Sequence, residues 1–234
     1  MEIRDICPIP LGVEVCPFHE NIKKLVLDEI DEHRSDNRHK QLNDRNLEHL
    51  DYYSPIHSDK FNELRHWIEL QAEIYAHDIL KYDIGEMIVT DSWLNVCHPG
   101  GYQYPHSHCN SVICALYYVS FDDEVDPPTY FYQPNPAQQF RDDMVFMLTK
   151  KNQTKYNCPN EVVGMEGTLI LWPSNVVHGY KRNDTNSSNR ITFSTNIMPT
   201  RVGSYKISPL STEDRNKQVL AERSGQLWDS PDFL

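Results

Sequence analysis

The sequence has 234 residues, which fits one large domain or two small ones and is long enough to bury a sizeable core. Hydrophobic residues make up 39% and charged residues 24% of the chain, so the composition excludes a disordered protein. The net charge of −12 argues against nucleic acid or an anionic membrane as the main partner.

The N-terminal segment and the cysteines favour a cytoplasmic protein. Residues 1–5 lack the basic and then apolar pattern of a secretory signal. No apolar run approaches the ~20 residues that a membrane-spanning helix needs. The six cysteines are scattered without CxxC spacing, so we expect reduced thiols and no structural zinc ribbon.

The first part of the chain is predicted to be largely helical. Residues 3–15 alternate loosely between apolar and polar side chains, with prolines between them, as in an edge strand. Apolar residues at three- and four-residue spacing then predict a helix over residues 20–33 and a longer one over residues 58–81. Ser58 is the expected N-cap of the longer helix. Residues 35–58, between them, are polar and are expected to form a long loop that could contact a substrate.

From residue 87 onward the pattern changes to short strands separated by Gly, Pro, Asn and Asp clusters. Strands are predicted over residues 87–96, 112–120, 129–132, 144–149, 168–172, 176–181 and 190–198. Many short strands without intervening helices indicate a mainly β fold, a double-stranded β-helix or jelly roll of the cupin kind with flanking N-terminal helices.

We therefore expect a single domain over residues 1–234 with three parts. Residues 1–86 would form a helical N-terminal part that packs on the barrel. Residues 87–198 would form the jelly-roll core, and residues 199–234 a C-terminal tail with a short helix over residues 212–224.

Three histidines are candidate metal ligands. His106 and His108 are two residues apart, so an extended backbone would place both imidazoles on one face. His178 follows an apolar run and a turn, which puts it near the start of a strand. Three converging imidazoles could hold a first-row metal ion. His98, beside Pro99, is a competing candidate whose spacing fits less well.

Arg190 opens a strand on which polar and apolar residues alternate. Polar residues stand at positions 190, 192, 194 and 196, and apolar residues at 191, 193 and 197. Either the polar face lies in water, as on an ordinary surface strand, or it faces a barrel interior. In the second case Arg190 could clamp a carboxylate through paired hydrogen bonds, and Thr192 or Ser194 could add a hydroxyl.

Over roughly residues 87–198 the chain resembles the iron(II)- and 2-oxoglutarate-dependent oxygenases, in particular a group frequent in bacteria and phages. The order and spacing of several segments carry the resemblance: Trp93-Leu94-Asn95-Val96, Gly100 to His108, Tyr117-Tyr118-Val119, Gly167 to Ser174, His178, and Arg190 to Ser194.

The resemblance implies a jelly roll with helices on one outer side and a hydroxylase that uses Fe(II), 2-oxoglutarate and O2. It implies iron held by His106, by the residue two later and by His178. The distal carboxylate of 2-oxoglutarate would lie on Arg190 and on Thr192 or Ser194. Tyr104 and Asn95 are weaker candidates for contacting the oxoacid.

The chain departs from the wider family at position 108, where the family has a carboxylate ligand. A three-histidine site is our preferred interpretation. Alternatively, His108 turns away and leaves a position for water or halide, Asn110 approaches the metal, or the acidic loop 122–126 supplies a carboxylate.

Two other functions compete with the oxygenase. A three-histidine cupin-type dioxygenase would need no oxoacid, and a non-catalytic jelly-roll module would only bind a ligand. A small molecule or a peptide is the expected substrate, with residues 122–139 as a second region for its contacts. A homodimer is one option, whereas nucleic acid and membranes are not expected partners.

Overall fold

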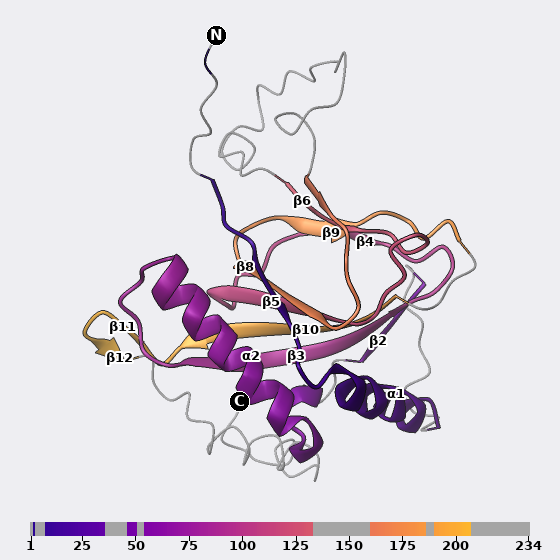
Figure 1. The fold of residues 1–234 in the computed structure, drawn as a ribbon, viewed down its shortest axis with the longest axis horizontal. Helices are drawn as coiled ribbons and strands as arrows, with labels where there is room; N and C mark the ends of the chain where they lie inside the picture. The colour runs from indigo at the N-terminus through magenta and orange to yellow at the C-terminus, as the bar shows by residue number, and fades with distance from the viewer. Residues whose placement is uncertain are drawn as a thin grey trace, which may run out of the picture.

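Two antiparallel sheets face each other and form the core of the molecule (Figure 1). The structure, a computed structural model, describes residues 2, 8–35, 46–50, 54–132, 160–185 and 190–206. The larger sheet has the strand order β1 (Gly12–Val15), β8 (Thr168–Pro173), β5 (Ile113–Ser120), β10 (Arg190–Pro199), β3 (Met87–Cys97), β2 (Leu47–Leu50). The smaller sheet has the order β4 (Gln103–His106), β9 (His178–Tyr180), β6 (Thr129–Phe131), β7 (Asn160–Val162).

Strands that are distant in sequence are neighbours in both sheets, and each described pairing between these strands is antiparallel. This is the arrangement of a double-stranded β-helix, so the jelly roll expected from the sequence is confirmed. The N-terminal part contributes β1 and β2 to the larger sheet in addition to its helices. A small hairpin of β11 (Arg201–Val202) and β12 (Tyr205–Lys206) follows β10.

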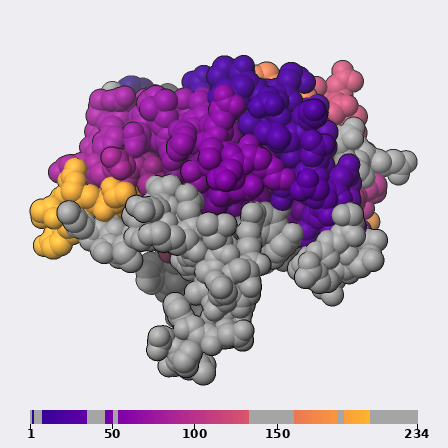
Figure 2. Space-filling model, turned by 90° about the horizontal axis from the view of Figure 1, so that it is seen from below, coloured from indigo at the N-terminus to yellow at the C-terminus, as the bar shows by residue number. Residues whose placement is uncertain are grey.

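Helices cover the outer face of the larger sheet. The main ones, α1 (His19–Ser35) and α2 (Asn62–Ile74), lie on the same side of that sheet, and the N-terminal segments form one continuous surface when seen from below (Figures 1 and 2). Two 3-10 turns, η1 (Pro55–His57) and η2 (Asp59–Phe61), precede α2, and a π-helical turn, η3 (Tyr75–Ile79), follows it. None of the described helices is long and apolar enough to cross a membrane.

Alternation along the strands divides the core into two layers. On β10, Ile191, Phe193 and Ile197 pack toward the helices, where the Phe193 ring lies 5.3 Å from the ring of Phe61. The opposite faces of β5 and β8 build a second apolar cluster between the two sheets. Because side chains alternate with period two, the even-numbered residues of β10 face this inner space. The inward-facing alternative for the Arg190 strand is therefore correct.

The helical region differs from the prediction at its start. Ser58 precedes η2 and makes no side-chain capping hydrogen bond, and α2 begins at Asn62 after the buried Phe61. Packing of Phe61 against Phe193 explains this, because the ring anchors the chain to the sheet and the tight turn η2 takes the place of the first predicted helical turn.

Two other regions differ from the elements that the sequence predicted. Within the expected loop 35–58, residues 47–50 form the edge strand β2, since Leu47 and Leu50 are buried. β9 spans only His178–Tyr180 instead of 176–181. The predicted strand 144–149 and the predicted helix 212–224 lie outside the described residues.

Candidate metal centre

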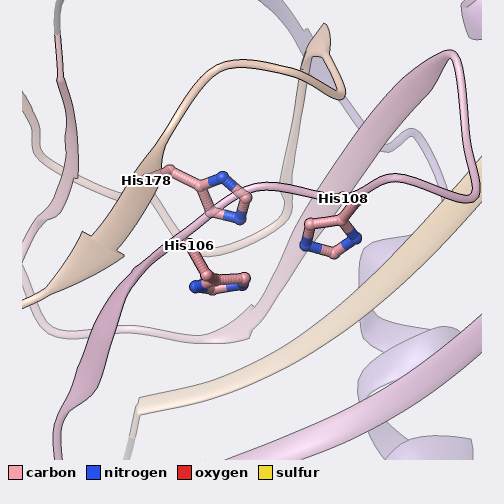
Figure 3. Close-up of side chains that lie close together, drawn as sticks. All are labelled: His106, His108 and His178. Carbon is pink, nitrogen blue, oxygen red and sulfur yellow. The ribbon is translucent and has the colours of Figure 1, made fainter. Parts of the chain in front are cut away.

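The structure brings His106, His108 and His178 together between the two sheets (Figure 3). His106 ends β4 and is paired with His178 at the start of β9. β4 does not continue to His108, whose backbone N–H instead donates to the carbonyl of Ser174 at 3.0 Å. One ring nitrogen from each residue lies within 4.8 Å of the other two, so all three can reach one ion.

Each of the three rings has a carbonyl oxygen beside its Nδ1 atom. The partners are the backbone carbonyl of Tyr104 for His106 at 2.8 Å and that of Val176 for His178 at 3.0 Å. For His108 the partner is the side-chain Oδ1 of Asn196 at 2.6 Å. A carbonyl oxygen only accepts, so Nδ1 carries the proton in each neutral ring and Nε2 keeps its lone pair. This arrangement leaves three Nε2 atoms available as metal ligands.

Burial keeps two of these imidazoles neutral. Desolvation, together with the nearby His106, lowers the pKa of His178 to about 3. Desolvation also lowers the pKa of His108, although its hydrogen bond to Asn196 opposes that shift. The Nε2 atom of His108 is buried and has no hydrogen-bond partner. A buried lone pair without a partner is costly unless something binds it, so these residues fit a metal ion.

Aromatic rings hold the imidazoles in place. Trp93 stacks on His108 with 5.5 Å between ring centres and 22° between planes. Trp172 meets His178 edge to face at 4.7 Å. The three histidines and both tryptophans line one pocket, whose other lining residues are Gln103, Cys114, Ala115, Leu116, Thr129, Gly179, Tyr180, Ser194 and Thr195.

No described residue that lines this pocket is a carboxylate. In the acidic loop, Asp126 accepts a hydrogen bond from the Asp122 backbone and is not among the lining residues. Asn110 receives a hydrogen bond from Asn196 at 3.4 Å and does not line the pocket either. His98 lies 3.2 Å from a carboxylate oxygen of Glu48. Neither Asn110 nor His98 nor the acidic loop 122–126 therefore lines the pocket as the structure describes it.

Arg190 is fully buried and lies behind residues that line the pocket. Its Nε donates to the carbonyl of Pro127 and its Nη2 to Oγ1 of Thr129, both at 3.0 Å. The guanidinium carbon lies 3.8 Å from the centre of the Tyr180 ring. Thr129 and Tyr180 are both pocket residues, so Arg190 adjoins the pocket through them. Its Nη1 atom is buried without a hydrogen-bond partner.

The other four residues that were expected to contact 2-oxoglutarate differ in where they lie relative to the pocket. Ser194 lines the pocket, and the buried Oγ1 of Thr192 has no partner. Asn95 accepts a hydrogen bond at its Oδ1 from Nδ1 of His49 at 2.6 Å. The side chain of Tyr104 is outside the pocket, with 60% of the residue exposed and its ring against Tyr102.

Sequence reasoning missed Gln103, Thr129, Tyr180 and Asn196. Asn196 could have been found, because it stands on the polar face of β10 together with Arg190. The other three belong to β4, β6 and β9, short strands whose sequences show no alternation long enough to assign a face.

One family model matches part of the chain. Residues 91–196 match the family model described as "Putative 2OG-Fe(II) oxygenase". No curated protein sequence matches the chain.

Solved structures of similar fold share little sequence with the chain. HygX from Streptomyces hygroscopicus, crystallised with nickel and 2-oxoglutarate, is 13% identical, with a TM-score of 0.57 over 82% of this chain and 83% of that one. The carbocyclase SnoK from nogalamycin biosynthesis is also 13% identical, with a TM-score of 0.57 over 80% and 79%. A prolyl-4-hydroxylase from Pseudomonas putida is 10% identical, with a TM-score of 0.51 over 81% and 92%.

At such identities the solved structures establish the fold alone, and the family model adds the chemistry. That model spans β3 to β10, and so includes all three histidines and Arg190. The region that holds the three histidines and Arg190 therefore matches the iron(II)- and 2-oxoglutarate-dependent oxygenases, a family whose members use Fe(II), 2-oxoglutarate and O2.

Proposed function

We propose that this enzyme hydroxylates a C–H bond of a small molecule at a three-histidine iron centre. In the balanced reaction, substrate, 2-oxoglutarate and O2 give the alcohol, succinate and CO2. One oxygen atom enters the alcohol and the other enters succinate. The observation that carries this proposal is the convergence of three neutral imidazoles, all with Nδ1 facing a carbonyl, inside a pocket of the region that matches the oxygenase family model.

The histidines would act as the protein ligands of the metal. His106, His108 and His178 would each supply Nε2 and leave open positions for the oxoacid and for oxygen. When bound, the iron and its oxoacid supply the oxidising chemistry, and the protein supplies coordination and orientation. Trp93 and Trp172 pack on these rings and keep them from turning away.

Arg190 is the proposed anchor for the distal carboxylate of 2-oxoglutarate. Two of its nitrogens are occupied by Pro127 and Thr129, which fixes the orientation of the guanidinium. The remaining Nη1, and Oγ1 of Thr192, are buried without partners and could bind a carboxylate oxygen. A buried, charge-assisted hydrogen bond of this kind is among the stronger polar contacts in proteins. Ser194, on the same strand face, would contribute its hydroxyl from the pocket wall.

A neighbour of similar fold supports the small-molecule substrate class. HygX, which shares the fold, has also been crystallised with hygromycin B, a small molecule.

A cytoplasmic location is part of the proposal, since Cys16, Cys97, Cys109 and Cys114 are free thiols, as is usual in a reducing compartment. Homodimer formation stays a prediction from the sequence, for light scattering to test.

Calorimetry without oxygen tests the proposed function directly. The protein is loaded with Mn(II) as a redox-silent substitute for iron and titrated with 2-oxoglutarate. Saturable binding is expected, and it should be lost when the metal is omitted, because the oxoacid would bind partly through the metal. In air, with Fe(II) and ascorbate, the protein should then release succinate. Metal binding without any 2-oxoglutarate binding would instead favour the cupin-type dioxygenase.

A further inference from the structure

His108 differs from the other two histidines in what holds its ring. The Nδ1 atoms of His106 and His178 face backbone carbonyls two residues earlier in the chain. His108 instead depends on the side chain of Asn196, which comes from β10 in the larger sheet. Among the three, His108 is therefore the ring whose orientation a single side chain controls.

The orientation of the Asn196 amide is set by its own neighbours. Its Nδ2 donates to Oδ1 of Asn110 at 3.4 Å, which points Oδ1 the other way. The thiol of Cys114 donates to the same Oδ1 at 3.8 Å. With Oδ1 facing His108 at 2.6 Å, the ring must donate from Nδ1 and present Nε2 to the other histidines.

Asn196 is also held rigidly by its backbone. β10 lies between β3 and β5, and Asn196 is paired with Asp91 on one side and Cys114 on the other. The register with β3 shifts directly after Asn196, and there Thr90 donates its hydroxyl to the Asn196 carbonyl at 3.2 Å. Only 3% of Asn196 is exposed, so the amide has little freedom to turn.

Stacking alone does not orient the His108 ring. Trp93 fixes the plane of the imidazole, at 22° to its own. A ring in that plane can still flip by half a turn and exchange its nitrogen and carbon edges. A carboxylate has two equivalent oxygens and needs no such control, whereas a histidine in the same position must have the correct nitrogen and the correct tautomer.

We propose that Asn196 is a positioning residue that makes His108 a metal ligand, by fixing both the tautomer and the flip of its ring. Asn196 thereby compensates for the carboxylate that this chain lacks at position 108. The inference rests on the proposed function, because it requires a metal at the three histidines.

The test counts the imidazoles bound to the metal. Wild type, Asn196→Ala and Asn196→Asp are loaded with Cu(II), and pulsed electron paramagnetic resonance detects the remote ring nitrogen of each coordinated imidazole. His108→Ala serves as the two-imidazole reference. Asn183→Ala is the matched control, since Asn183 is equally buried, bonds to Thr185 and does not line the pocket.

Three imidazoles are expected in wild type, in Asn196→Asp and in Asn183→Ala, because aspartate keeps an acceptor for Nδ1–H. Asn196→Ala should show two imidazoles and bind Mn(II) about 10- to 100-fold more weakly, as is typical when the partner of a metal-binding histidine is lost. Three imidazoles at wild-type affinity in Asn196→Ala would overturn the proposal. Failure of wild type to bind metal would instead reject the proposed function, and two imidazoles in wild type would reject the three-histidine ligand set.

A second measurement does not depend on the folding of a variant. Long-range proton–nitrogen correlation spectra of the metal-free wild type report which nitrogen of each ring is protonated. His108 is expected with its proton on Nδ1. A proton on Nε2 would contradict the role of Asn196 even if Asn196→Ala does not fold.

Discussion

The guanidinium carbon of Arg190 lies 3.8 Å from the centre of the Tyr180 ring, which is two residues beyond His178 on β9. Two further hydrogen bonds, to Pro127 and Thr129, fix the plane of the group. The contact links the proposed oxoacid anchor to the strand that carries a proposed metal ligand. Only a planar cation with several donors can make all of these contacts at once.

Replacing Arg190 by lysine should therefore weaken 2-oxoglutarate binding although the charge is kept. A lysine ammonium cannot stack on Tyr180 and serve Pro127, Thr129 and a carboxylate together. Loss of one charge-assisted hydrogen bond, worth about 1.5–3 kcal/mol, predicts a Kd about tenfold higher or more. Calorimetry with the Mn(II)-loaded protein measures it, and Mn(II) affinity itself should not change. Arg201→Lys, in a surface pair with Asp83, is the control. Equal oxoacid affinity in Arg190→Lys and wild type would rule out Arg190 as the anchor.

Removing the His108 imidazole should cost the protein most of its metal affinity. His108→Ala leaves two of the three imidazoles that the described residues bring together, His106 and His178. We expect Mn(II) to bind at least ~100-fold more weakly, a larger loss than for removal of a hydrogen-bond partner of a ligand. His98→Ala removes a histidine that pairs with Glu48 outside the cluster and should bind Mn(II) as wild type does. If His108→Ala kept its affinity, the ring would be a bystander and another group would complete the site.

The long strands of the larger sheet could be predicted from the sequence because they are long enough to show a period. β10 alternates over several residues, so its polar face, with Arg190 and Ser194, could be assigned before its surroundings were known. β3, β5 and β8 were predicted within about two residues of their ends, as is usual for long apolar strands. The start of β9 at His178 agrees with the expected position of that histidine near a strand start.

Contacts between the two sheets could not be predicted in the same way. The bond between His108 and Asn196 joins residues 88 positions apart, and it depends on how the sheets face each other as well as on the strands themselves. The edge strand β2 was assigned to a loop, because four residues with two buried leucines do not establish a period. The position of Gln103 in the pocket could not be predicted for a related reason. The pairing of β4 with β9 is irregular between Gln103 and His106, so alternation along β4 does not show which side chains face the pocket.

Gly179 keeps the strands of His106 and His178 close together. A Cβ atom at this position would lie 2.7 Å from the backbone oxygen of Gln103 and 3.1 Å from that of Tyr104. Gly179→Ala should therefore push β4 away from β9, which destabilises the protein by about 1–3 kcal/mol and separates two proposed ligands. Urea unfolding of the metal-free protein and Mn(II) calorimetry measure the two effects. Lys181→Ala, at an exposed position just beyond β9, should show neither. Wild-type behaviour of Gly179→Ala in both assays would show that the strands can separate freely.

Glu166 joins helix α1 to the sheet and should make stability depend on pH. Its carboxylate lies 2.6 Å from Nζ of Lys23 and 3.2 Å from Nε2 of His19. Burial opposes ionisation of Glu166, but Lys23 and His19 outweigh it and lower the pKa of Glu166 below its usual 4.5. With the folded pKa below the unfolded one, the stabilisation is complete above the unfolded pKa and is lost as pH falls through the folded pKa.

Glu166→Gln should remove this contribution while keeping the size of the side chain. At pH 7 we expect the variant to be less stable than wild type by about 0.2–1 kcal/mol, since the carboxylate is partly exposed to solvent. As pH falls through the folded pKa of Glu166, which lies below 4.5, the two unfolding free energies should converge, because wild type then loses the charge that the variant lacks. Urea unfolding between pH 3 and 7 measures the difference, with Glu161→Gln, in an exposed pair with Lys181, as the control. A difference between wild type and Glu166→Gln that stays constant over this pH range would show that the loss comes from altered packing and not from the charge.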